Sequence, residues 1–218
     1  MTTTTMTEIE WAQRIVKDIS FWRPARPVII ELGAHHGNDT VVLYDACGVS
    51  PHYLAVEADP RNIPLLVNRV GNRNARVAHY AVAGHCGTVD LNLSSGPNAT
   101  GSSSIRRPKE HLRSFPETIF AEVVVVPALT LDALASVYQM YSAIDLIWCD
   151  IQGAERDMIA GGQETLKRTS YLLCECDAVE MYEGQITRDG FLDLLPGWEL
   201  IGEWPENANL LLQNRAKA

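Results

Sequence analysis

The stretch VIIELGAHHGND, residues 28–39, decides the fold of this chain. It runs from an uncharged apolar segment into an acid, two glycines and a pair of histidines. A short apolar run rich in β-branched residues is typical of a buried parallel strand. Gly33 and Gly37 then bracket a turn where the lack of a Cβ lets a ligand approach the backbone. We interpret the stretch as a strand that ends in a ligand-binding turn, the alternative being a core strand followed by an ordinary loop.

The same pattern recurs along the chain. A second apolar strand, HYLAVE, precedes a predicted helix at 59–71, in which Asp59 is the N-cap and Pro60 takes the first helical position. IDLIWCDIQGAERDMIAGG, residues 144–162, again predicts an apolar strand that ends in an acid, Asp150, followed by a tight turn and a helix. Alternating strands and helices indicate an α/β fold, a doubly wound, mostly parallel sheet with helices on both faces.

Two segments depart from this alternation. TVDLNL alternates apolar and polar residues, as a half-exposed strand does, and predicts an antiparallel excursion. The Ser- and Gly-rich residues 94–108 that follow are either a mobile connection or a lid over a site. After them, Thr130 can cap the helix LDALASVY. At the end of the chain, GWELIGEW and ANLLLQN predict an antiparallel C-terminal hairpin at the sheet edge.

We expect one domain over residues 28–218, preceded by an N-terminal helical extension at 1–27. In the extension, WAQRIVKDISFW has the pattern of an amphipathic helix that packs over the site or against a second subunit. A homo-oligomer is therefore one of the states that we expect for this chain.

Charge and composition exclude several classes of protein. With 18 Lys and Arg against 27 Asp and Glu, the net charge is −9, which disfavours nucleic acid as the main partner. No apolar run reaches the roughly 18 to 20 residues that span a bilayer, and no secretory signal pattern is seen at the start. We therefore expect no membrane association and a cytoplasmic location, where the five cysteines are free thiols.

Acids stand at the ends of three predicted strands: Glu31, Glu57 and Asp150. Ligands of doubly wound sheets bind beyond the carboxyl ends of the strands, and an acid ending the second strand accepts the hydroxyls of a ribose. The glycines of the first turn are spaced G-x-x-x-G rather than G-x-G-x-x-G. This spacing lacks the glycines that cradle a pyrophosphate and favours a nucleoside ligand without one.

Each of these residues also has a purely structural interpretation. Glu31 and Asp150 can be N-caps of the helices that follow them, and Glu155 can be a first-turn acid favoured by the helix dipole. His35 and His36 can satisfy loop carbonyls instead of acting as a general base.

In order along the chain, several motifs resemble those of a known family. They are ELGAHHG, VEADPRN, AVAGHCGTVDLNL with GSSSI, VPALTLDAL, IDLIWCDIQGAERDMIAGG and ANLLLQN. The series resembles the class I S-adenosylmethionine-dependent methyltransferases, and GSSSI, TLDAL and DIQGAE favour the FkbM type. The resemblance covers about residues 28–214 and implies a Rossmann-like sheet.

The resemblance implies a role for each matching residue. Glu31 and the 33–37 turn would face the methionine part of S-adenosylmethionine, Glu57 the ribose, and residues 81–83 the adenine edge. Asp150, Gln152 and Glu155 would lie near the transferred methyl or the acceptor. His35 stands where the family usually has asparagine. The full expected cofactor site is Glu31, Gly33, Ala34, His35, Gly37, Asn38, Glu57, Ala58, Val82, Asp150 and Gln152, with Asp150, Glu155 and His35 as catalytic candidates.

The expected activity is O-methylation of a hydroxylated small molecule, a sugar or a natural-product intermediate. Methyl transfer from a sulfonium is an in-line displacement, which needs a positioned hydroxyl and a base for its proton. A divalent cation between Asp150 and Glu175 or Asp177 is conceivable, because hard oxygen ligands suit magnesium, but no required metal is predicted. Two alternatives are a nicotinamide-dependent oxidoreductase and a non-catalytic protein that only binds S-adenosylmethionine.

Overall fold

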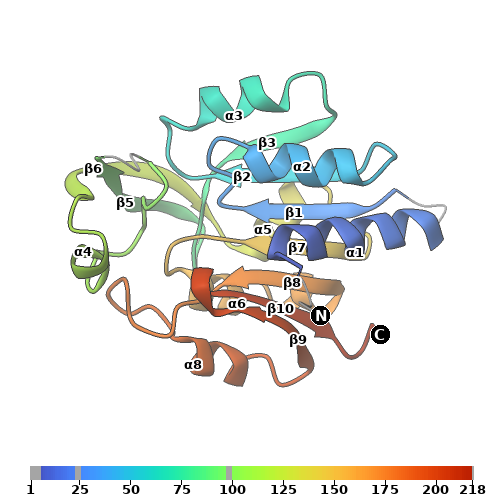
Figure 1. The fold of residues 1–218 in the computed structure, drawn as a ribbon. Coiled ribbons are helices and arrows are strands. Elements are labelled where there is room, and N and C mark those ends of the chain that lie inside the picture. Colours follow the sequence, from blue (N-terminus) through green and yellow to red (C-terminus); the bar gives the residue numbers. More distant parts are fainter. Residues whose placement is uncertain (1–5, 23–25, 97–99, 218) are drawn as a thin grey trace.

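The computed structural model describes residues 6–22, 26–96 and 100–217. Its centre is a seven-stranded sheet (Figure 1). The strands of this sheet are β1 (Val28–Leu32), β2 (His52–Glu57), β3 (Ala75–His79), β7 (Ile144–Cys149), β8 (Thr169–Glu175), β9 (Trp198–Trp204) and β10 (Asn209–Asn214).

The strand order is β3-β2-β1-β7-β8-β10-β9. The first five strands in this order are parallel, and β1 pairs with both β2 and β7. The chain therefore reverses its winding between β1 and β7, which is where such sheets bind ligands. β10 lies antiparallel to β8 and to β9, and the two last strands are joined through a short 3₁₀ turn, Pro205–Asn207. The predicted mostly parallel sheet with its antiparallel C-terminal edge hairpin is confirmed.

Helices cover both faces of the sheet, as predicted. α1, α2 and α3 pack on one face, and α5, α6, α7 and α8 contribute buried side chains to the other. The helices are α1 (Glu8–Trp22), α2 (Asn38–Ala46), α3 (Ile63–Val70), α4 (His111–Ser114), α5 (Leu131–Val137), α6 (Glu155–Ala160), α7 (Gln163–Lys167) and α8 (Arg188–Asp193).

The central strands are buried along their whole length, because both faces carry helices. All five residues of β1 and all six of β7 are buried. Such strands gain from apolar side chains pointing to both faces, and this explains why all residues of β1 except Glu31 and all residues of β7 except Asp145 are apolar.

A second, three-stranded sheet stands beyond the carboxyl ends of the parallel strands (Figure 1). It consists of β4 (Ala81–Val82), β5 (Gly87–Ser95) and β6 (Ile119–Leu129), in the order β4-β6-β5. β5 and β6 are antiparallel, which confirms the predicted excursion.

The two predicted helix starts have different outcomes. Thr130 caps α5, with its hydroxyl accepting a hydrogen bond from the Ala133 N–H over 3.2 Å. The predicted cap at Asp59 is wrong, because α3 begins only at Ile63. The Asp59 carboxylate instead holds the Arg61 guanidinium, over 2.5 Å at the shortest contact. The residues between the strand and the helix form a turn.

The N-terminal helix α1 is part of the core rather than a separate cover. Ala12, Ile15 and Val16 are buried with β1 and β7 side chains, and the helix contacts α2. Thr7 and Glu10 start it with a capping box, in which each main-chain N–H donates to the other side chain. The helix therefore covers a sheet face, and its first turn reaches the connection between β9 and β10, where the Asn207 amide donates to Glu8 Oε1 over 2.7 Å.

The described residues test two expectations, that no helix crosses a membrane and that the cysteines are free thiols. No helix within the described ranges combines the length and the apolarity that crossing a bilayer requires. All five cysteines are free thiols, and Cys86 alone among them is exposed.

Candidate active site

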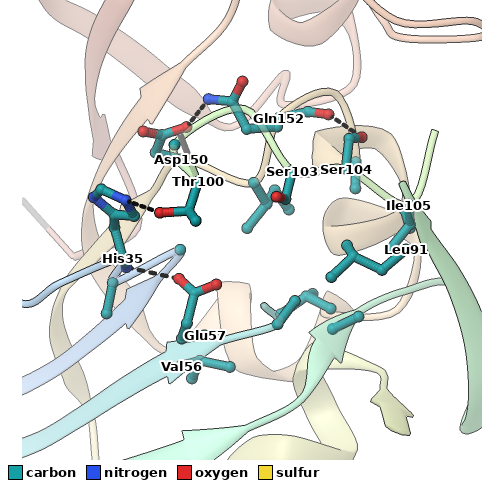
Figure 2. Close-up of a pocket in the computed structure, with 18 of the residues that line it drawn as sticks. His35, Val56, Glu57, Leu91, Thr100, Ser103, Ser104, Ile105, Asp150 and Gln152 are labelled. Atoms are coloured by element: carbon teal, nitrogen blue, oxygen red, sulfur yellow. Dashed lines mark hydrogen bonds between the residues drawn. The ribbon is translucent and has the colours of Figure 1, made fainter. Parts of the chain in front are cut away.

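A cavity opens at the carboxyl ends of β1, β2 and β7, where the winding reverses. Its empty volume is about 930 Å³, which includes space open to solvent. Figure 2 shows Glu57 and Asp150 on different sides of it, with Leu91 and Ile105 as an apolar wall facing His35. The lining residues include most of the expected cofactor site: Gly33, Ala34, His35, Asn38, Glu57, Ala58, Val82, Asp150 and Gln152.

The turn after β1 needs an unusual backbone. Gly33 and His35 have φ angles of 86° and 48°, in the left-handed region. A Cβ on Gly33 would lie 1.7 Å from the Asp150 carbonyl oxygen, so only glycine lets the ends of β1 and β7 meet. Histidine and asparagine tolerate the left-handed region better than most residues, which explains why His35 can replace the asparagine of the family pattern.

Glu57 lines the cavity with both carboxylate oxygens already oriented. Oε2 accepts a hydrogen bond from the His35 N–H and Oε1 one from the Asp59 N–H, each over 2.7 Å. Burial raises the pKa of Glu57 to about 6, and these two N–H donors counteract part of that rise. Oε1 also accepts a hydrogen bond from the Asn62 side-chain amide over 3.4 Å, so the free acceptor capacity of the carboxylate lies mainly on Oε2.

Two residues of the expected cofactor site do not line the cavity. Glu31 points into the sheet face under α2, where its Oε2 accepts hydrogen bonds from the hydroxyls of Thr40, over 2.6 Å, and Tyr53, over 2.8 Å. Burial raises the pKa of Glu31 to about 8. Gly37 is directed at Leu66 of α3, whose Cδ1 would lie 2.7 Å from an added Cβ. Glu31 and Gly37, both expected at the cofactor, thus lie outside the cavity lining, where they serve packing behind the turn.

Asp150 and Gln152 follow β7 and line the cavity from the other side. The Gln152 amide nitrogen donates to Asp150 Oδ1 over 2.5 Å and to Glu175 Oε2 over 3.0 Å. Its amide oxygen accepts from the Tyr182 hydroxyl over 2.7 Å. Burial first, and then the charge of Asp150, raise the pKa of Glu175 well above its usual value.

The third expected catalytic residue, Glu155, does not reach the cavity. Its side chain is 1% exposed under the turn before α6, where Oε1 accepts the Gly153 N–H over 3.0 Å. Oε2 has no hydrogen-bond partner among the described residues. Burial raises the pKa of Glu155 to about 8. A neutral acid that braces the 151–154 turn explains this position better than a base, because the side chain has no route to a ligand.

Residues 100–105, here called the lid, close over the cavity. The Thr100 hydroxyl bonds to His35 Nε2 over 2.8 Å, and the Ser103 hydroxyl donates to Asp59 Oδ2 over 2.8 Å. The Ser104 hydroxyl donates to the Gln152 carbonyl over 2.6 Å. Of the two sequence interpretations, these contacts support a lid. Residues 97–99 of that segment lie outside the described residues.

His35 and His36 stack face to face, with ring centroids 3.7 Å apart. Burial, followed by the neighbouring His36, lowers the pKa of His35. The His35 ring is therefore neutral at physiological pH and able to accept a proton, although its Nε2 is engaged with the lid.

The acids do not fit a divalent cation. In the described part of the chain, no group of three or more His, Cys, Asp or Glu side chains is arranged to hold a metal. The space between Asp150 and Glu175 is crossed by the two hydrogen bonds of the Gln152 amide. The other acid considered, Asp177, accepts a hydrogen bond from Gln185 over 3.1 Å.

Several lining residues were not foreseen individually. The Ser-rich motif GSSSI pointed to the lid, yet only the fold shows which of its hydroxyls face the cavity. Tyr182, which orients Gln152, carries no sequence signal because it lies in an irregular connection after β8. Ala81, expected at the adenine edge, also lines the cavity. The additional lining residues are Asp39, Val56, Tyr80, Leu91, Thr100, Gly101, Ser103, Ser104, Ile105, Trp148, Ile151 and Ala154.

Comparison with known proteins agrees with this geometry. Residues 31–210 match the methyltransferase FkbM domain. The chain is 34% identical over 203 residues to the 2-O-methyltransferase NoeI of Sinorhizobium fredii (strain NBRC 101917 / NGR234), covering 90% of this chain and 83% of that protein.

Solved structures share the fold. WbdD matches with a TM-score of 0.52 at 11% identity, covering 95% of this chain and 39% of that one. Cofactor-bound Rv0187 from MTB matches with a TM-score of 0.50 at 10% identity, covering 98% of this chain and 83% of that one. The domain match sets aside the nicotinamide-dependent and non-catalytic alternatives. The chain belongs to the FkbM methyltransferase family and is an S-adenosylmethionine-dependent methyltransferase.

Proposed function

We propose that this enzyme is an O-methyltransferase that acts on a hydroxyl of an uncharged, polyhydroxylated small molecule, a sugar or a sugar-bearing natural product. The observation that carries the proposal is the Asp150 carboxylate, held at the cavity wall by Gln152. It supplies a proton acceptor beside the space that remains once Glu57 has bound a ribose. The similarity to a protein named a 2-O-methyltransferase supports oxygen as the accepting atom.

The charge of the cavity favours a neutral acceptor. Its described lining contains the acids Asp39, Glu57 and Asp150 but no lysine or arginine. A phosphorylated or carboxylated acceptor would meet like charges with no cation to pair with. Hydroxyl groups, by contrast, find acceptors in Asp39 and Asp150 and hydroxyl partners in the lid.

The proposed chemistry requires little from the protein beyond position and one proton transfer. When bound, S-adenosylmethionine supplies an electrophilic methyl, which leaves its sulfur as a new oxygen–methyl bond forms. Asp150 takes the proton of the acceptor hydroxyl, so the negative charge developing on oxygen is removed as the bond forms. The lid shields one side of the cavity from bulk water, which limits competition by water as the acceptor.

Three variants separate the candidate bases. Asp150→Asn keeps the shape of the side chain and should slow transfer by about 10²- to 10⁴-fold, with cofactor affinity nearly unchanged. His35→Asn restores the family residue and should retain most activity. Glu155→Gln, away from the cavity, should also retain it. Full activity of Asp150→Asn with loss in His35→Asn would move the base to the imidazole.

The acceptor class is tested by transfer of labelled methyl from S-adenosylmethionine to matched sugars. Neutral hexoses and deoxyhexoses with a free 2-hydroxyl are expected to be methylated. The corresponding uronic acids and sugar phosphates should react far more slowly, and Asp39→Asn should narrow that difference. Preferential methylation of the acidic sugars, or of an amine, would contradict the proposal.

The remaining proposals concern the cofactor contacts and the setting of the protein. We place the cofactor against Gly33, Ala34, His35, Asn38, Glu57, Ala58, Val82, Asp150 and Gln152, supported by their position on the cavity.

A cytoplasmic location is supported by the five free cysteines. Size-exclusion chromatography with light scattering would establish whether the chain forms a homo-oligomer.

A further inference from the structure

The side chain of Gln152 is fixed by partners on every polar atom. Its amide nitrogen carries two hydrogens, one for Asp150 and one for Glu175, and its oxygen accepts from Tyr182. Its main-chain carbonyl also accepts from Ser104 of the lid. The residue holds this position at a φ angle of 51°, a left-handed conformation that non-glycine residues adopt at a cost.

The orientation of the amide follows from its neighbours. Reversing it would put the amide oxygen 2.5 Å from Asp150 Oδ1 and 3.0 Å from Glu175 Oε2. Three acceptors would then meet unless both acids carried protons. The observed orientation gives each carboxyl group a donor, and the amide oxygen faces the Tyr182 hydroxyl, whose single hydrogen it shares with the Ser102 carbonyl.

We propose that the Gln152 amide occupies the position between Asp150 and Glu175 that a divalent cation would otherwise take, and so makes this methyltransferase independent of metal. Gln152 is then a positioning residue. It orients Asp150 by hydrogen bonding, the task that a bound cation would perform by coordination. Its amide is neutral and therefore adds no charge beside the two acids.

The geometry distinguishes this arrangement from an ordinary buried amide. Magnesium and manganese favour carboxylate oxygens, and two acids from adjacent strands, β7 and β8, converge here. The amide nitrogen touches both, so a cation could bind only if Gln152 left or supplied an oxygen. Changing that single nitrogen to oxygen should therefore create a metal site.

The test measures Mn²⁺ binding by electron paramagnetic resonance of free Mn²⁺, a readout that does not depend on activity. Gln152→Glu would gather three carboxylates and should bind one Mn²⁺ per chain, whereas the parent protein should show no saturable binding. Gln163→Glu adds the same charge on α7, outside the cavity, and should behave like the parent. Gln152→Ala, which only empties the space, should bind Mn²⁺ more weakly than Gln152→Glu and serves if that variant fails to fold.

Activity supplies the second readout, and this part rests on the proposed function. Parent turnover should be the same in EDTA and in magnesium, whereas Gln152→Glu turnover should fall in EDTA and recover with added metal. Tyr182→Phe should lower kcat more than it changes the KM for S-adenosylmethionine, because the amide loses its orientation. Mn²⁺ binding by the parent at Asp150, or none by either Gln152 variant, would overturn the inference. If the Mn²⁺ results were as predicted but the parent protein did not bind S-adenosylmethionine, the proposed function would be refuted and the inference about Gln152 would stand.

Discussion

The main-chain N–H of His35 donates a hydrogen bond to Oε2 of Glu57 over 2.7 Å, which joins the turn after β1 to the end of β2. Gly33 and Ala34 reinforce the junction, since both their N–H groups donate to the Val56 carbonyl over 2.9 Å. The carboxylate is thus held in place before any ligand arrives. A preorganised acceptor loses little further freedom on binding, so its hydrogen bonds contribute more fully to affinity.

Cofactor affinity should depend on the ionisation of Glu57. Its pKa in the free enzyme is raised to about 6, and only the ionised form has both oxygens available as acceptors. Affinity should therefore be constant above pH 7 and weaken about tenfold for each unit below pH 6. Calorimetric titration with S-adenosylhomocysteine between pH 5 and 8 checks this, and a dissociation constant that does not change across that range would count against the assignment.

Gly33 should be intolerant of any side chain. Gly33→Ala places a methyl 1.7 Å from the Asp150 carbonyl, so the ends of β1 and β7 must separate. We expect a loss of more than about 4 kcal/mol in the free energy of unfolding. Gly48→Ala is the matched control, because Gly48 also has a positive φ, 67°, but a Cβ there meets nothing within 4 Å. Gly48→Ala should lower the free energy of unfolding by about 1 to 2 kcal/mol. Equal losses for the two variants in urea unfolding would show that backbone strain alone governs both sites.

Glu31 should make the enzyme less stable as the pH rises. The native state keeps the proton to about pH 8, whereas the unfolded chain releases it near the ordinary value of 4.5. Between these values the unfolded state binds fewer protons, so stability falls by about 1.4 kcal/mol per pH unit for this group. Glu31→Gln keeps an acceptor for Thr40 and Tyr53 and removes this contribution. In urea unfolding, the free energy of unfolding should decrease less between pH 5 and pH 8 for Glu31→Gln than for the parent protein. An equal decrease in both proteins would refute the raised pKa of Glu31.

The Arg61–Asp59 pair should hold the lid closed. Arg61 bridges Asp59 to the Ser94 carbonyl over 2.9 Å, and Ser103 bonds to the same carboxylate. Arg61→Ala should speed dissociation of S-adenosylhomocysteine and expose residues 100–105 to protease. Arg73→Ala removes an ion pair of the same 2.5 Å length, with the exposed Asp45 and away from the cavity, and should leave both properties unchanged. Identical dissociation rates in the two variants would mean that this pair does not secure the lid.

Most of the fold could be predicted from local sequence. The apolar strands, the Thr130 cap and the C-terminal hairpin depend on neighbouring residues, and all appear where they were predicted. Asp59 makes the local bond that a cap would make, since its Oδ1 accepts the Arg61 N–H over 2.9 Å. This bond closes the turn before the helix rather than the helix itself, which begins only at Ile63.

The site was predictable to the level of strand ends but not of side-chain direction. Glu31 and Glu57 both stand near the end of a strand, yet one turns under α2 and the other into the cavity. Glu155 had the right spacing for a reactive group but is buried beneath its own turn. The role of Tyr182 depends on packing against Gly153, whose Cβ position lies 3.0 Å from the Tyr182 Cβ, and this proximity follows only from the folded chain.

The most direct measurement is calorimetric titration of S-adenosylhomocysteine into the parent protein, Glu57→Gln and Glu31→Gln at pH 7.5. The account predicts saturable binding by the parent and by Glu31→Gln with closely similar affinity. For Glu57→Gln it predicts at least about tenfold weaker binding, because a hydrogen bond to a charged acceptor contributes about 1.5 to 3 kcal/mol. Weakened binding by Glu31→Gln with full binding by Glu57→Gln would place the cofactor elsewhere and contradict the central claim.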